Sequence, residues 1–188
     1  MEKSAKLGKL TLLNIILFGF IGQVAWAVEN NFFNTFLFSF GGTTKDISTM
    51  VAASAVVAVV TTFVMGTLSD KLGRRKVFIC AGYVAWGITV MAFAFISREN
   101  LGKLIGADPS SAAALSATVT TVIVMDCIMT FMGSTSNDSA FNAWITDVTV
   151  PSNRAKTEGL LAILPVLALV IVTGVFGFIA GGDAQASD

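Results

Sequence analysis

Five long stretches of apolar residues, joined by short polar connections, constrain this 188-residue chain more than any other feature. Crossing about 30 Å of hydrocarbon takes about 20 helical residues at about 1.5 Å each. Hydrophobic residues make up 54% of the chain and charged residues only 13%, where soluble domains carry about 25% charged residues. Such a chain cannot present a polar shell to water, so its solvent is mostly lipid. We therefore predict an all-α integral membrane helical bundle.

The expected membrane spans are residues 10–40, 47–69, 76–97, 112–146 and 158–181. The first span is read as one long helix, because the apolar run resumes at Phe32. A signal peptide is the alternative, since three lysines precede a short apolar run that ends in Ala25-Trp26-Ala27, with Ala27 as the cleavage site. Polar residues beyond Ala27 recur at helical spacing, which favours a retained helix.

The positions of Lys and Arg predict the orientation, because these residues stay on the cytoplasmic side of span ends. Of the 12 basic residues, the following fall on one side: Lys3, Lys6, Lys9, Lys71, Arg74, Arg75, Lys76, Arg154 and Lys156. Lys45, Arg98 and Lys103 fall on the other. We expect a multi-pass protein of the cell membrane with a cytoplasmic N-terminus and residues 183–188 outside.

Charge and composition also exclude several kinds of partner. The 12 acidic residues balance the 12 basic ones, so the chain has no excess of positive charge with which to bind nucleic acid. Histidine is absent, which removes the usual metal ligand and neutral-pH base. We therefore expect no metal site, no cofactor and no nucleic-acid partner, and the lipid bilayer is the first partner of the chain.

The connection between the second and third spans carries the most specific motif, Gly66-Thr67-Leu68-Ser69-Asp70-Lys71-Leu72-Gly73-Arg74-Arg75-Lys76. Gly66 would let a neighbouring helix approach closely, and Gly73 permits a tight turn. Asp70, at a helix end, can pair with a basic group or face the positive N-terminus of another helix. Arg74 and Arg75 hold the loop in the cytoplasm. A generic positive loop would explain the cations but not the glycine and aspartate spacing.

This motif resembles the signature loop between helices 2 and 3 of the major facilitator superfamily, and every specified position is met. The resemblance implies a gating loop formed by Gly66, Asp70, Gly73, Arg74 and Arg75. It also implies a transporter of two six-helix halves with the solute bound between them. Five expected spans then correspond to most of an N-terminal half, residues 1–188. We expect this chain to be a fragment that is inactive without its C-terminal half.

A second stretch, Asn137 to Trp144, resembles helix 4 of the glycoside–cation symporters of melibiose-carrier type. Asp138 followed by Phe141 carries this likeness, and in that family the aspartate binds sugar hydroxyls. The same carriers place two carboxylates one turn apart just before a Met-Gly in helix 2. Here Ala58 and Thr62 precede Met65-Gly66, so the resemblance does not extend to that sodium site.

Three carboxylates fall in the interior of the expected spans, and such residues are functional candidates by default. Glu29, Asp126 and Asp138 are the candidates for coupling transport to a proton or sodium ion. Polar residues recur at helical spacing around Glu29, and Ser134, Asp138 and Asn142 recur every four residues. The expected substrate-binding residues are Gln23, Trp26, Glu29, Asn30, Asp138 and Asn142.

Carboxylates and amides beside tryptophan suit a sugar-like solute, because its hydroxyls need partners and its apolar face can stack on a ring. We predict a secondary active transporter of symporter type that moves a small polar solute, with a sugar as the candidate. A non-transporting scaffold or sensor of carrier fold, and a drug or metabolite proton antiporter, are the alternatives. No enzyme is expected, since neither Asp126 nor Asp138 has the Gly-x-Gly-Asp context of intramembrane aspartyl proteases.

Overall fold

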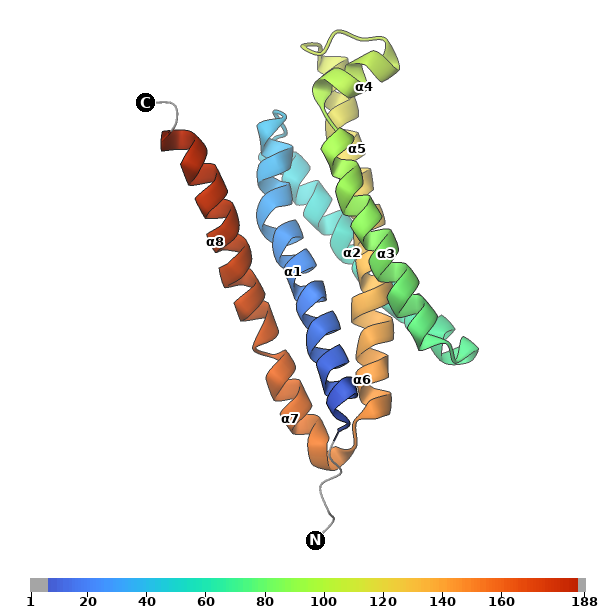
Figure 1. The fold of residues 1–188 in the computed structure, drawn as a ribbon. Helices are drawn as coiled ribbons and strands as arrows, with labels where there is room; N and C mark the ends of the chain where they lie inside the picture. The colour runs from blue at the N-terminus through green and yellow to red at the C-terminus, as the bar shows by residue number, and fades with distance from the viewer. Residues whose placement is uncertain (1–6, 186–188) are drawn as a thin grey trace. The chain divides into compact units, whose positions relative to one another are not determined.

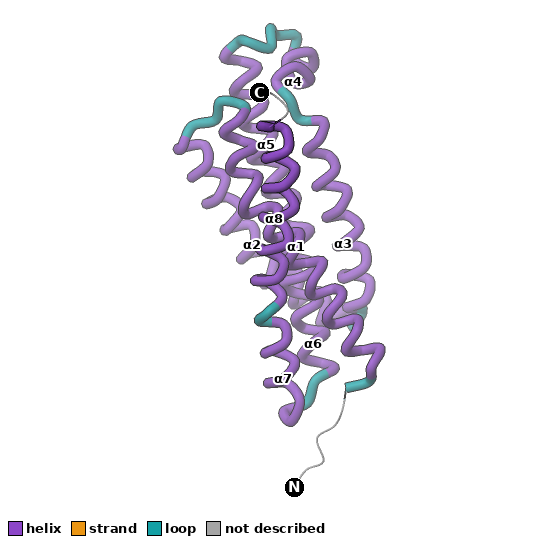
Figure 2. Tube along the Cα trace, turned by 60° about the vertical axis from the view of Figure 1, so that its left-hand side comes forward, coloured by secondary structure: helices purple, strands orange, loops and turns teal. Residues whose placement is uncertain are grey.

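The computed structural model describes residues 7–185, of which 176, 177 and 179–185 are described by their backbone alone. All regular elements in these residues are helical (Figure 1), and short loops connect most of them (Figure 2). They are α1 (Lys9–Ser39), α2 (Thr44–Leu72), α3 (Arg75–Ala92), η1 (Phe93–Phe95), α4 (Arg98–Ile105), α5 (Ala112–Gly133), η2 (Ser134–Phe141), α6 (Asn142–Val148), α7 (Pro151–Leu161) and α8 (Leu164–Gln185).

Five helical segments of the described chain are long and apolar enough to cross a membrane: Lys9–Ser39, Thr44–Leu72, Arg75–Phe95, Ala112–Val148 and Pro151–Val175. The prediction of an all-α membrane bundle is therefore confirmed. Two features were not expected from the sequence. The connection after the third segment contains the short helix α4, and the fourth segment contains the π-helix η2 between α5 and α6.

The helix ends follow from local hydrogen bonding. Thr43 and Asp46 form a capping box at the start of α2, in which the Asp46 carboxylate accepts from the Thr43 N–H at 2.8 Å. Gly73 ends α2 and Gly106 ends α4, both with a left-handed backbone at φ values of 61° and 69°. Ser111 caps the start of α5 by accepting from the N–H of Ala114.

Contacts within the chain divide it into two units, and residues 1–33 with 145–188 form the first. In this unit α1 packs against α8 through small and branched side chains, Ala27, Ala168 and Val172. Larger apolar residues of α1 surround this cluster, including Phe20 and Phe32. Because lipid is as apolar as these side chains, close van der Waals packing stabilises such a pair rather than the hydrophobic effect.

The second unit comprises residues 34–144. In it both α2 and α3 pack against α5 and against η2, and α4 packs against α5. Trp86 of α3 and Met129 of α5 are among its most deeply buried side chains. The same helices carry the polar residues described next, so packing around η2 determines where those side chains lie.

Candidate functional site: a carboxylate network on a π-helix

The π-helix η2 is a short polar segment inside an otherwise apolar span. Most of its side chains are buried, including four hydroxyls. Those of Thr135, Ser136 and Ser139 each donate a hydrogen bond to a carbonyl four residues earlier in the chain, at distances of 2.7, 2.9 and 2.9 Å respectively. Such bonds compete with the regular helix ladder and distort it. π-Helical segments within α-helices recur at functional sites, which makes η2 a candidate.

The Asp138 side chain is held by two donors from η2. Asn137 Nδ2 donates to Asp138 Oδ1 at 3.0 Å, and Ser134 Oγ donates to Asp138 Oδ2 at 2.9 Å. On α3, the Tyr83 hydroxyl donates to Asn137 Oδ1 at 2.9 Å. A carboxylate offers about four acceptor sites, so each oxygen of the half-buried Asp138 retains one more. The carboxylate is therefore fixed in orientation and still able to accept from a bound molecule.

An aromatic pair and an amide follow Asp138 within two turns. The rings of Phe141 and Trp144 have centroids 6.0 Å apart and planes tilted by 38°. The exposed Asn142 donates from Nδ2 to the backbone oxygen of Asp138 at 3.1 Å. The structure thus brings together the predicted series of Ser134, Asp138 and Asn142, although the helix there is not a regular α-helix.

Backbone packing brings Tyr83 to this segment. A Cβ atom added at the neighbouring Gly82 would lie 2.6 Å from the Cβ of Ser136, so α3 approaches η2 as closely as a glycine allows. At Gly66, where the sequence predicted a close approach, an added Cβ would lie 3.8 Å from the Cβ of Ser139, an ordinary contact. Gly82 and Tyr83 were not among the residues predicted from the sequence. The signal for them was a single tyrosine, next to a glycine, in an apolar span.

Asp126 occupies a separate place in the same unit. It lies on α5 with 3% of its surface exposed, and the Ser54 hydroxyl of α2 interacts with its carboxylate. Twelve residues separate it from Asp138, about 18 Å along a helix at about 1.5 Å per residue. The structure therefore does not bring the two aspartates together.

The predicted binding residues of α1 belong to the first unit. Glu29 is buried, with 9% of its surface exposed, whereas Asn30 is exposed. The Asn30 amide donates to the backbone oxygen of Trp26 at 2.9 Å, so part of its hydrogen-bonding capacity is used within its own helix. Gln23 and Trp26 are half-buried on the same helix. Their predicted contact with solute remains a prediction.

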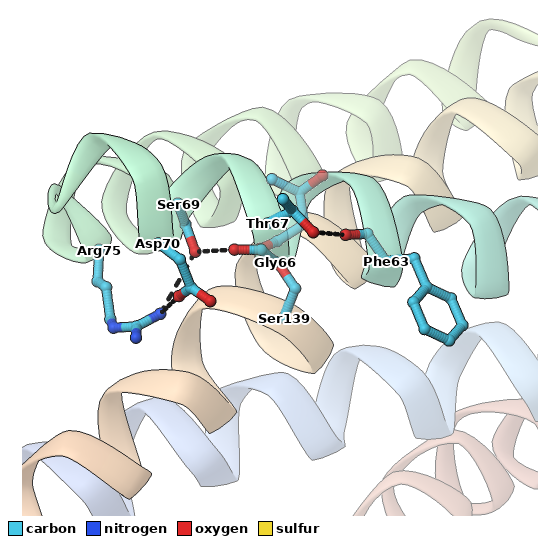
Figure 3. Close-up of polar contacts among 8 residues, drawn as sticks. Phe63, Gly66, Thr67, Ser69, Asp70, Arg75 and Ser139 are labelled. Carbon is cyan, nitrogen blue, oxygen red and sulfur yellow. Dashed lines mark hydrogen bonds and ion pairs between the residues drawn. The ribbon is translucent and has the colours of Figure 1, made fainter.

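An ion pair and a glycine organise the loop between α2 and α3, and Figure 3 shows the ion pair between Arg75 and Asp70. Arg75 Nη1 lies 2.6 Å from Asp70 Oδ1 and 3.4 Å from the hydroxyl of Ser69. Ser69 is fully buried and donates to the backbone oxygen of Gly66 at 3.0 Å. The Gly73 N–H caps the helix at the carbonyls of Ser69 and Asp70. Arg75, the first residue of α3, is thus a basic partner of Asp70, and Arg74 directly precedes this helix.

The described residues contain no group of three or more His, Cys, Asp or Glu side chains that could hold a metal ion. A family model described as Major Facilitator Superfamily matches residues 13–184. That range includes both the loop after α2 and the network around Asp138. Comparisons with curated proteins and with solved structures found no match.

Proposed function

Because the chain belongs to the Major Facilitator Superfamily of membrane transporters, we propose that it carries a small hydroxyl-bearing solute, a sugar being our first choice, by symport and alternating access. The observation that supports this proposal is the Asp138 carboxylate, held by Asn137 and Ser134 with acceptor sites to spare. Sugar hydroxyls are donors that fit those sites. Trp144, half-buried and six residues after Asp138, offers a ring to the apolar side of a sugar, and the buried Phe141 lies beside that ring.

Coupling to an ion follows from the same chemistry. A carboxyl group that gains a proton on one side of the membrane and loses it on the other can couple solute flux to the proton gradient. Asp138 is our first choice for this role, and Glu29 and Asp126 are further candidates. Sodium is the alternative coupling ion.

The loop after α2 is proposed to act as a gate on the cytoplasmic side of the cell membrane. The ion pair between Asp70 and Arg75 holds the loop in one conformation, and Gly73 allows its sharp turn. In this proposal the N-terminus is cytoplasmic and the chain forms part of an N-terminal half. The C-terminal half is a partner that completes the solute cavity, so the 188-residue chain alone should not transport. Saturable uptake by liposomes that contain only this chain would contradict that.

The test is solute uptake by the complete carrier in cells, with a panel of ¹⁴C-labelled glucosides, galactosides, polyols and amino acids. Imposed proton or sodium gradients would identify the coupling ion. Asp138→Asn removes the charge of the carboxylate, and a hydrogen bond to a charged group contributes about 1.5–3 kcal/mol. We expect uptake to fall by about 10- to 100-fold at equal membrane abundance. Asp108→Asn, at an exposed carboxylate between α4 and α5, is the matched control. Undiminished uptake in Asp138→Asn would remove this residue from the site.

Asp126 favours a second candidate, a drug or metabolite proton antiporter. Its carboxylate is almost fully buried between α5 and α2, a place that a proton reaches more easily than a polar solute. In this case the panel would give no uptake. Efflux driven by a pH gradient would be lost in Asp126→Asn and retained in Asp138→Asn.

A further inference from the structure

The hydrogen-bond network at Asp138 begins on a different helix, at the single tyrosine of the chain. Tyr83 lies on α3, 54 positions before Asn137, and its hydroxyl donates to the side-chain oxygen of that asparagine at 2.9 Å. This bond joins the third and fourth apolar segments through side chains. It is a tertiary contact, so its presence depends on how α3 packs against η2.

The bond from Tyr83 decides which way the Asn137 amide points. With Oδ1 accepting from the hydroxyl, Nδ2 faces Asp138 and donates to its carboxylate at 3.0 Å. The opposite amide orientation would place the carbonyl oxygen against the carboxylate oxygen, and two acceptors repel each other. The tyrosine and the aspartate thus stabilise the same orientation of Asn137, and the amide in turn fixes one oxygen of Asp138.

Packing restricts the tyrosine itself. Its ring lies 5.8 Å from that of Trp86, tilted by 48°, and Trp86 is 2% exposed. The close approach of Gly82 to Ser136 brings the backbone of α3 against η2. The Tyr83 hydroxyl therefore reaches Asn137 from a rigid support, which is what a positioning group requires.

We propose that Tyr83 is a positioning residue for this site, a role that rests on the proposed function of Asp138 in solute binding. Through Asn137 it holds the Asp138 carboxylate in the orientation that receives the solute, without touching the solute itself. Removing its hydroxyl should weaken solute binding and leave the turnover of bound solute nearly unchanged. Any conformational step that separates α3 from η2 would break the 2.9 Å bond and loosen the carboxylate.

The first test uses the 188-residue chain in lipid nanodiscs with ring-¹³C-labelled tyrosine, which gives one tyrosine signal because Tyr83 is the single tyrosine. Asn137→Ala removes the acceptor of its hydroxyl, so the phenol signal should shift. Thr89→Val is the matched control, since that half-buried hydroxyl on α3 donates to the backbone carbonyl of Trp86 in its own helix. An unchanged signal in Asn137→Ala, or an equal shift in Thr89→Val, would overturn the proposal.

The second test measures uptake kinetics in the complete carrier, with the ¹⁴C-labelled panel member that the unmodified carrier takes up fastest. We expect Tyr83→Phe to raise KM about three- to tenfold, the range for loss of one neutral hydrogen bond, with kcat within about twofold. Thr89→Val should change neither. If Tyr83→Phe leaves KM unchanged while Asp138→Asn is inactive, the positioning role of Tyr83 is overturned and the proposed function stands. Full activity of Asp138→Asn overturns the proposed function on which it rests.

Discussion

Replacing Gly82 with alanine tests the packing on which the candidate site depends. The added methyl carbon would lie 2.6 Å from the Cβ of Ser136 and 3.3 Å from its Cα and Oγ. Carbon atoms pack best at about 3.5–4.0 Å, so α3 and η2 must separate by about 1 Å. Overpacking of this kind costs about 1–3 kcal/mol, while alanine gains about 1 kcal/mol over glycine in helix propensity.

Gly87→Ala is the matched control on the same helix, because an added Cβ there meets nothing within 4 Å. Both variants gain the same helix propensity, so the free energy of unfolding should be about 1–3 kcal/mol lower for Gly82→Ala than for Gly87→Ala. Denaturant unfolding in detergent micelles, followed by circular dichroism, measures this difference. The double variant Gly82→Ala/Ser136→Gly lacks the Ser136 Cβ that the new methyl group would meet. Relief of this clash should restore part of the lost free energy of unfolding. Equal stability of the two alanine variants would refute the close approach of α3 to η2.

Three further predictions concern the loops. Gly73→Ala should lower the free energy of unfolding by about 1–2 kcal/mol in the same assay, because the φ of 61° at this helix end disfavours any side chain. In a cysteine-free background, the thiol introduced by Arg74→Cys should be protected from a membrane-impermeant maleimide added outside the cells, and the thiol introduced by Ser110→Cys should be labelled. The reverse labelling pattern would contradict the proposed orientation. The hydrogen bond and charge of Lys103 hold the pKa of Glu99 below its usual value of 4.5. This stabilisation of α4 is present above pH 4.5 and is lost as the pH falls through the lowered pKa of Glu99. Hydrogen exchange of the α4 amides, corrected for its intrinsic pH dependence, should therefore show less protection at pH 3 than at pH 6.

The helical bundle could be predicted because lipid leaves few alternatives to a chain of this composition. A backbone in hydrocarbon must satisfy its own hydrogen bonds, so an uncharged run of about 20 residues forms a helix. The short helix α4 also had a sequence signal that was overlooked. Ser97 caps its start by accepting from the N–H of Asn100, and Gly106 ends it with a left-handed backbone. Both are ordinary start and stop residues of a helix.

The network around Asp138 was only partly predictable. Spacing of four residues brings Ser134 to Asp138 on one helix, and that contact is local. The contact of Tyr83 with Asn137 spans 54 positions, and no periodicity in one segment indicates which residue of another it meets. The shift from α-helix to π-helix is likewise a consequence of packing against α2 and α3 as well as of local hydroxyl bonding. Side-chain spacing could therefore identify the carboxylate but not the groups that orient it.

The donors of η2 suggest which solutes the site would reject. The hydroxyls of Thr135, Ser136 and Ser139 give their hydrogens to backbone carbonyls, so they have none left for a solute. The spare capacity of Asp138 is for accepting, and its charge repels anions. We therefore expect neutral or cationic hydrogen-bond donors to bind and acids of the same skeleton to be rejected. Competition of glucose and of glucuronate against the transported panel member tests this. Equal inhibition by both compounds would show that a negative charge at Asp138 does not face the solute.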